Sequence, residues 1–195
     1  MVNHFDCLAS VYDRFAAAPD RVRLHALLDL PAAGLLLDAA GGTGHVSFPL
    51  QPHVKAAVIA DLSRGMLRQA SSKGFTLLVR ARIEALPFRA ASFSRILLVD
   101  ALHHVRNQEA GVAELARVLQ PRGRLVVIEP DIRRLAVKLI YFVEVLLGMG
   151  SRFRFPAEIT ALLSRQGLRT AVAGDDAFRV WIVAERPRGG ETDDP

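Results

Sequence analysis

The sequence predicts an α/β fold in which helices cover a mostly parallel sheet, and two observations support this prediction. Short runs rich in Val, Ile and Leu alternate along the 195 residues with segments of helical periodicity, which is the pattern of a parallel sheet covered by helices. The last two runs are separated only by Gly174, Asp175 and Asp176. Such a short connection is a hairpin-type turn, so the final strand is expected to be antiparallel to its neighbour.

Seven strands and four helices are expected along the chain. Runs such as 96–99 and 125–128 are continuously aliphatic, as strands buried on both faces are. The strands are expected at 35–40, 56–61, 76–80, 94–100, 124–129, 168–173 and 179–184. The helices are expected at 9–30, 63–72, 108–119 and 156–166. Residues 119–123, with Pro121 and Gly123, should stop the third helix and begin a turn.

Composition and patterning indicate one intracellular domain. No repeat or linker divides residues 1–187, and the polar residues 188–195 are expected to be a disordered tail. The N-terminal segment has no apolar run typical of a secretory signal, and the apolar stretch 135–150 is interrupted by Lys138 and Glu144. A single cysteine argues against a disulfide and a cysteine-based metal site. A cytoplasmic protein without a metal is therefore expected.

The net charge of +5 and the pI near 10.1 raise the question of a nucleic-acid partner. The arginines are scattered, however, without a block of like charges or interleaved aromatics. Nucleic acid is therefore not expected as the main partner.

The segment LLLDAAGGTGHVS, residues 35–47, is the first sign of a ligand site. Gly41, Gly42 and Gly44 follow the first strand, and such a turn lets the backbone approach a ligand where side chains would collide. A plain tight turn is the alternative. Asp61 ends the next strand, where a carboxylate can accept hydrogen bonds from both ribose hydroxyls. Alternatively, Asp61 only caps the following helix.

The residues near this turn favour a cationic ligand over a pyrophosphate. Ser47 stands where a dinucleotide fingerprint has its third glycine, and Asp38 precedes the turn. A carboxylate there would repel phosphate but suits an ammonium or sulfonium group. S-adenosylmethionine is therefore favoured over NAD.

Six segments, in this order, resemble one family. They are FDCLASVYDRF (5–15), LLLDAAGGTG (35–44), VIADLSRGML (58–67), EALPF (84–88), ASFSRILLVDALHHV (91–105) and ELARVLQPRGRLVVIE (114–129). The chain is thereby similar to class I S-adenosylmethionine-dependent methyltransferases, most of all to the ubiquinone/menaquinone C-methyltransferase type. The resemblance implies a Rossmann-like seven-stranded sheet of order 3-2-1-4-5-7-6 with strand seven antiparallel.

The resemblance also implies which residues bind S-adenosylmethionine and release S-adenosylhomocysteine. The methionine end should meet Asp38, the turn of Ala40, Gly41, Gly42, Thr43 and Gly44, and Val99. Asp61 should bind the ribose, and the adenine should lie against Leu62, Met66, Arg82 and Ile83. Residues 1–30, with Tyr12, should form a lid, and residues 131–156 a cap on the acceptor side.

Two residues depart from the family pattern. Arg82 stands where the family often has Asp, and arginine cannot accept a hydrogen bond from the adenine amino group. Ser94 replaces the usual Asp after Phe93. A methyltransferase-like binding protein that has lost catalysis is therefore one alternative function, and RNA methylation, suggested by the pI, is another.

The acceptor should be a small apolar or aromatic molecule that meets residues following the fourth strand. His103 or His104 could act as a general base if the acceptor must lose a proton, and Asp100 could orient it. Alternatively, these side chains only pack at the strand end. The apolar segment 131–155 with flanking arginines fits a cap over the acceptor, an amphipathic element on a membrane surface, or simply a helix covering the sheet. The acceptor, the atom methylated and the oligomeric state, monomer or homodimer, stay open.

Overall fold

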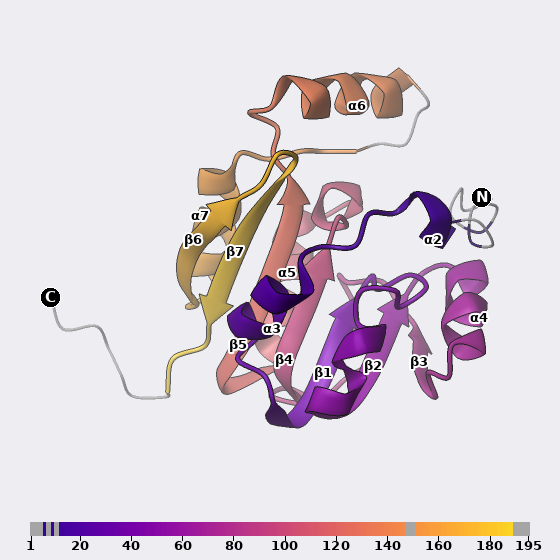
Figure 1. The fold of residues 1–195 in the computed structure, drawn as a ribbon. Coiled ribbons are helices and arrows are strands. Elements are labelled where there is room, and N and C mark those ends of the chain that lie inside the picture. The colour runs from indigo at the N-terminus through magenta and orange to yellow at the C-terminus, as the bar shows by residue number, and fades with distance from the viewer. Residues whose placement is uncertain (1–5, 7–8, 10–11, 147–150, 189–195) are drawn as a thin grey trace, which may run out of the picture.

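A computed structural model describes residues 6, 9, 12–146 and 151–188, and shows one seven-stranded sheet (Figure 1). The strand order is β3-β2-β1-β4-β5-β7-β6. The five neighbouring strands from β3 through β2, β1 and β4 to β5 run parallel, whereas β7 is antiparallel to both β5 and β6. The predicted fold class and strand order are confirmed. The expected tail lies outside the described residues, apart from residue 188.

The strands lie close to the predicted ranges. They are β1 (Ala32–Ala39), β2 (Val54–Asp61), β3 (Leu77–Arg80), β4 (Phe93–Val99), β5 (Leu119–Pro130), β6 (Arg169–Asp175) and β7 (Arg179–Glu185). Only β5 begins much earlier than expected. Leu119 pairs with Phe93, and the predicted turn is a bend early in β5, where Arg122 has a φ of 62°. The shift in register between Phe93 and Arg95 accommodates this bend.

The first predicted helix, 9–30, is wrong as a continuous element. The structure has α2 (Tyr12–Phe15) and α3 (Arg21–Leu27) instead. Pro19 disfavours helical backbone at the residue before it, and the Asp20 side chain then caps α3 by accepting a hydrogen bond from the Arg23 N–H. The remaining helices are α4 (Arg64–Ser72), α5 (Gln108–Val118), α6 (Leu135–Leu146) and α7 (Pro156–Ser164), with short 3₁₀ helices η1 (Phe48–His53) and η2 (Leu102–His104).

Alternate residues of the central strands enter two separate cores, one on each face of the sheet. Leu37, Ile96 and Leu98 pack in a core that includes buried residues of α5 and α7. Leu36 and Leu97 pack on the other face, in a core that includes residues of α3, η1 and α4. The continuous aliphatic runs thus reflect strands buried on both faces.

The parallel strands end at one edge of the sheet, which is the upper edge in Figure 1. The chain between α2 and α3 passes across the upper ends of the central strands, and α6 lies above β4 and β5 (Figure 1). In open parallel sheets ligands bind at this edge, outside the carboxyl ends of the strands. Among the described residues, no helix has the length and apolar character needed to cross a bilayer.

Candidate functional site

The glycine turn after β1 is shaped by backbone that few residues tolerate. Ala40, Gly42 and Gly44 have φ values of 51°, 56° and 70°, in the left-handed region that favours glycine. A Cβ on Gly41 would lie 2.4 Å from the Asp38 carboxyl carbon. The chain continues through turns into the 3₁₀ helix η1, where Pro49 and Pro52 lack the N–H groups that an α-helix needs.

Asp61 closes the turn from the end of β2. One carboxylate oxygen accepts from the Gly42 N–H at 2.8 Å, and the other accepts from the Ser63 N–H at 2.7 Å. Ser63 itself caps α4, because its hydroxyl accepts from the Met66 N–H. Ser63, rather than Asp61, is therefore the residue that caps α4. Burial raises the pKa of Asp61, and the two N–H donors oppose that rise.

Asp38 is a buried carboxylate with an oxygen that has no partner among the described residues. Burial raises the pKa of Asp38 to about 7, the Ser47 hydroxyl opposes the rise, and the charge of Asp61 adds to it. A buried acceptor without a donor is costly. A cationic donor placed beside Asp38 would satisfy the free oxygen and favour the ionised form.

One cavity is lined by residues from several elements and includes much of the predicted site. Asp38, Ala40, Gly41 and Gly42 come from the end of β1, Val99 and Asp100 from the end of β4, and Tyr12 from α2. The prediction missed Ala17, His45 and Val46, which also line the cavity. Ala17 and His45 had no sequence signal, because they reach the cavity only through the path of the segment after α2 and of the glycine turn.

The other predicted cofactor residues lie outside this cavity lining. Thr43 and Gly44 support the turn, and Met66 is buried behind it. Ile83 packs in a core, whereas Leu62 is 45% exposed. Arg82 forms an ion pair with Glu84 at 3.0 Å.

Polar contacts fasten the segment that carries Tyr12 over the turn. The Thr43 hydroxyl donates to Asp13 at 2.5 Å, and Lys73 from the end of α4 forms an ion pair with Asp13. The Lys73 ammonium also donates to the Thr43 carbonyl at 3.0 Å. Burial raises the pKa of Tyr12 to about 12, so its hydroxyl stays protonated at the cavity.

A guanidinium joins the same segment to the end of β4. Arg179 at the start of β7 donates to the Asp100 carboxylate at 2.7 Å and to the Ala17 carbonyl at 2.8 Å. Asp100 has a φ of 49° and is held by its N–H bond to the Ile128 carbonyl. Burial raises the pKa of Asp100, and Arg179 opposes that rise. This arginine was not predicted, because it lies 79 residues from its partner.

The two candidate histidines occupy different surroundings. His103 is 5% exposed, and its Nδ1 lies 2.6 Å from Glu129, which also accepts from the Ala101 and Leu102 N–H groups. Burial lowers the pKa of His104 to about 4, so its ring is neutral at pH 7. Glu129 was not predicted, although it ends the aliphatic run of β5.

Comparisons with known proteins show which proteins this chain is similar to. Residues 37–127 match a family model described as a methyltransferase domain. A ubiquinone/menaquinone biosynthesis C-methyltransferase of Syntrophotalea carbinolica is 37% identical over 52% of this chain and 46% of its own length. The same enzyme of Geobacter sulfurreducens is 27% identical over 80% of this chain and 73% of its own. The chain thus spans about half of the first relative and more of the second.

A solved structure shows the same fold. The YcgJ protein of Bacillus subtilis superposes with a TM-score of 0.73 at 21% identity, over 87% of this chain and 98% of that protein. Part of the chain is thus similar in sequence to methyltransferases, and its seven-stranded sheet has the fold of this solved structure.

Proposed function

We propose that the chain is a class I S-adenosylmethionine-dependent methyltransferase, and that it methylates a ring carbon of a small, apolar aromatic acceptor of the quinol type. The similarity to a methyltransferase family model and to C-methyltransferases supports this proposal. The acceptor class rests on what the names of the relatives from Syntrophotalea carbinolica and Geobacter sulfurreducens say. Bound S-adenosylmethionine would supply an activated methyl group on a sulfonium. The protein would then have to align the reacting atoms and exclude water from them.

The observation that carries the proposal is the pair of carboxylates on either side of the glycine turn. Asp38 has a buried oxygen without a partner among the described residues, and it lines the cavity where an ammonium group would fit. Each oxygen of Asp61 accepts one N–H bond and keeps a second lone pair for a ribose hydroxyl. A Cβ on Gly41 would fill the space beside Asp38. The residues present therefore fit an amino acid joined to an adenosine.

Further cofactor contacts follow from the same placement. We assign the Ala40 carbonyl, Val99 and Tyr12 to the methionine end, because Ala40, Val99 and Tyr12 line the cavity with Asp38. Leu62, Met66 and the backbone of Ile83 are assigned to the adenine. Because Arg82 is paired with Glu84, we assign its guanidinium plane to the face of the adenine ring rather than to the adenine amino group.

Asp100, His103 and His104 would act on the acceptor side. Arg179 holds Asp100 at the cavity, so this carboxylate orients the acceptor. His104, with a pKa of about 4, is neutral but is a weak proton acceptor at pH 7. His103 is paired with Glu129, an arrangement that orients an imidazole and stabilises its protonated form. His103 is therefore the stronger candidate base if the ring hydroxyl must be deprotonated.

Calorimetry with S-adenosylmethionine and S-adenosylhomocysteine tests the cofactor assignment. We expect binding in the micromolar range and at least about tenfold weaker binding for Asp61→Ala, because two hydroxyl contacts are lost. Glu109→Ala, an exposed acidic position on α5, is the matched control and should bind normally. Absence of binding at millimolar cofactor would overturn the proposal.

Label transfer separates the alternatives for the acceptor. The chain is incubated with methyl-labelled cofactor and either demethylated quinols or total RNA. Label in the quinol fraction is expected. Label in RNA would show that RNA, and not a quinol, is the acceptor. Cofactor binding without label transfer to either fraction would favour a binding protein that has no catalytic activity.

A further inference from the structure

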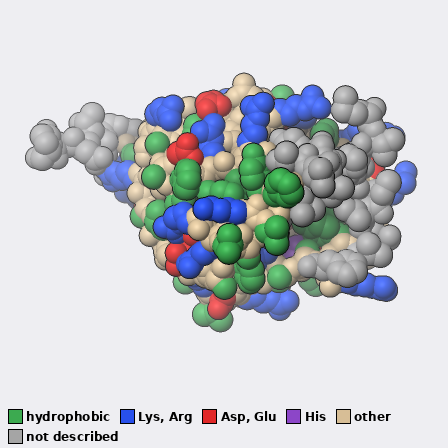
Figure 2. Space-filling model, turned by 90° about the horizontal axis from the view of Figure 1, so that it is seen from above, with side chains coloured by type: hydrophobic (Ala, Val, Ile, Leu, Met, Phe, Trp, Pro, Cys, Tyr) green, Lys and Arg blue, Asp and Glu red, His purple; other side chains and the backbone are tan. Residues whose placement is uncertain are grey.

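Helix α6 presents an apolar face to solvent. Leu135, Leu139 and Phe142 are 82%, 65% and 65% exposed, and their spacing of four and three residues places them on one side of the helix. Val137 is buried, and Tyr141, although 37% exposed, contacts the ring of Phe153 at 5.3 Å between centroids, so Val137 and the ring of Tyr141 face the rest of the domain. Figure 2, which looks down on this end of the molecule, shows hydrophobic side chains gathered there with Lys and Arg side chains around them.

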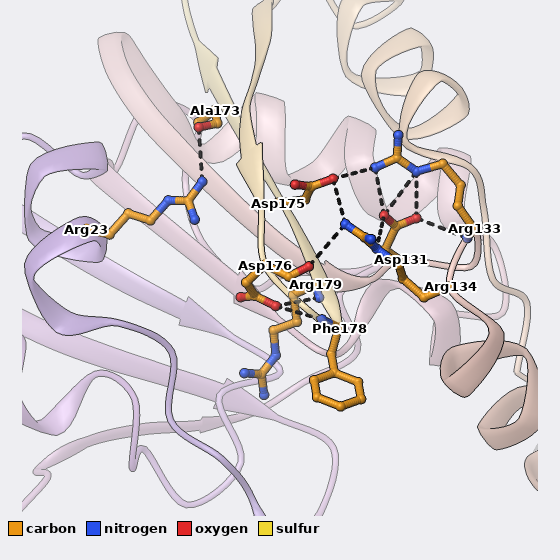
Figure 3. Close-up of polar contacts among 9 residues, drawn as sticks. All are labelled: Arg23, Asp131, Arg133, Arg134, Ala173, Asp175, Asp176, Phe178 and Arg179. Atoms are coloured by element: carbon orange, nitrogen blue, oxygen red, sulfur yellow. Dashed lines mark hydrogen bonds and ion pairs between the residues drawn. The ribbon is translucent and has the colours of Figure 1, made fainter.

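The basic residues near α6 fall into two groups. Arg133 and Arg134 are neutralised by Asp131 and Asp175, which tie the start of α6 to the end of β6 (Figure 3). These ion pairs hold the helix in place. Lys138, by contrast, is exposed and forms no ion pair with a described residue. It lies three residues after Leu135 and four before Phe142, so it belongs to the apolar face itself.

We propose that α6 rests on the surface of a bilayer that contains anionic lipids. Leu135, Leu139 and Phe142 would enter the boundary between headgroups and acyl chains, as the apolar face of an interfacial helix does. The Lys138 stem would lie along that boundary with its ammonium among anionic headgroups. A two-fold contact with a second copy would instead bring two Lys138 ammoniums toward each other, which disfavours that occupant.

The position of α6 also explains why a membrane would help this chain. The inner side of α6 reaches the site through rings: Tyr141 contacts Phe153, and Phe153 stacks on His103 at 4.4 Å. The Arg152 N–H donates to the His103 carbonyl at 2.7 Å, which fixes the returning segment beside η2. An apolar acceptor dissolved in the bilayer would therefore enter beside His103. This last step rests on the proposed function, whereas the membrane contact does not.

Flotation with lipid vesicles tests the contact without using methyl transfer. Full-length protein is mixed with vesicles of phosphatidylcholine alone, or of phosphatidylcholine with one quarter phosphatidylglycerol. We expect stronger binding to the anionic vesicles. Leu139→Asp should weaken binding to both by about tenfold, because an apolar contact is lost. Lys138→Glu should weaken only the binding to anionic vesicles, by about thirtyfold for a change of two charges.

Two controls match these variants. Val22→Asp changes an apolar residue on α3 that is 82% exposed, and Lys55→Glu reverses an exposed lysine on β2. Both should float like the unchanged protein. Circular dichroism checks that every variant is folded, whereas cofactor calorimetry tests only the proposed function.

Two results would overturn the membrane contact. One is an unchanged protein that does not float with either vesicle although it binds cofactor. The other is a dimer in sedimentation that Leu139→Asp converts to monomer, which would assign the face to a second copy.

Discussion

The two sides of the site are held together in different ways. On the side of β1 and β2, the defining contact joins the Gly42 backbone to Asp61, 19 residues away. On the side of β4 and β5, side chains meet across the sheet: His103 pairs with Glu129, 26 residues away, and Asp100 with Arg179, 79 residues away. The first side is shaped by backbone that excludes side chains, the second by buried charges. Substitutions should therefore damage the first by collision and the second by lost pairing.

The largest effect is expected where a side chain meets the glycine turn. Gly44→Ala would place a Cβ 2.5 Å from Ile59 and Phe75 at a φ of 70°. We expect a loss of about 3 kcal/mol or more in the free energy of unfolding, from overpacking and strained backbone together. Urea denaturation measures it.

Gly74→Ala is the matched control, because its φ is 94° but nothing lies within 4 Å of the new Cβ. It should lose only about 1 kcal/mol of unfolding free energy, the cost of backbone strain. Equal losses for both glycines would show that collision plays no part in the turn.

The buried pair on the other side should respond to charge rather than size. Glu129→Gln keeps the shape but removes the carboxylate from His103, and we expect the unfolding free energy to fall by about 2–4 kcal/mol. Glu185→Gln changes an exposed ion pair with Arg124 and should cost at most about 1 kcal/mol. Cofactor affinity should stay unchanged in both variants. A neutral Glu129→Gln result would contradict the role of this pair.

The smallest effect is a pH dependence confined to the cofactor side. Because the pKa of Asp38 is raised to about 7, binding a cation there requires loss of a proton below that pH. Cofactor affinity should fall as pH drops from 7 to 5.5, by up to about tenfold per unit. The unliganded protein has the opposite trend, since a raised carboxyl pKa makes stability fall as pH rises toward 7.

Calorimetry across this pH range measures the first trend and urea denaturation the second. Asp38→Asn should bind cofactor weakly at every pH and lose both trends. An unchanged pH profile in that variant would assign the titration to another group.

The difference between the two sides of the site also decides what could be predicted from the sequence. The strands, the glycine turn and Asp61 follow from local patterns, namely aliphatic runs and a carboxylate at a strand end. Glu129 and Arg179 carry no local signal, because their partners come together only when β4, β5 and β7 are assembled. The lid was predicted as one helix because the periodicity of 9–30 outweighed Pro19. Arg82 was expected to lie at an adenine, but its pairing with Glu84 depends on a turn that spacing alone does not reveal.

Arg179 joins the segment that follows α2 to the end of β4. Its guanidinium donates at once to the Ala17 carbonyl and to Asp100, so opening of the proposed lid would take a partner from the carboxylate that we propose to meet the acceptor. By thermodynamic reciprocity, any ligand that draws Asp100 away from Arg179 changes the tendency of the lid to open by the same factor. If Asp100 meets the acceptor as proposed, acceptor binding and movement of the segment at Ala17 are therefore thermodynamically coupled.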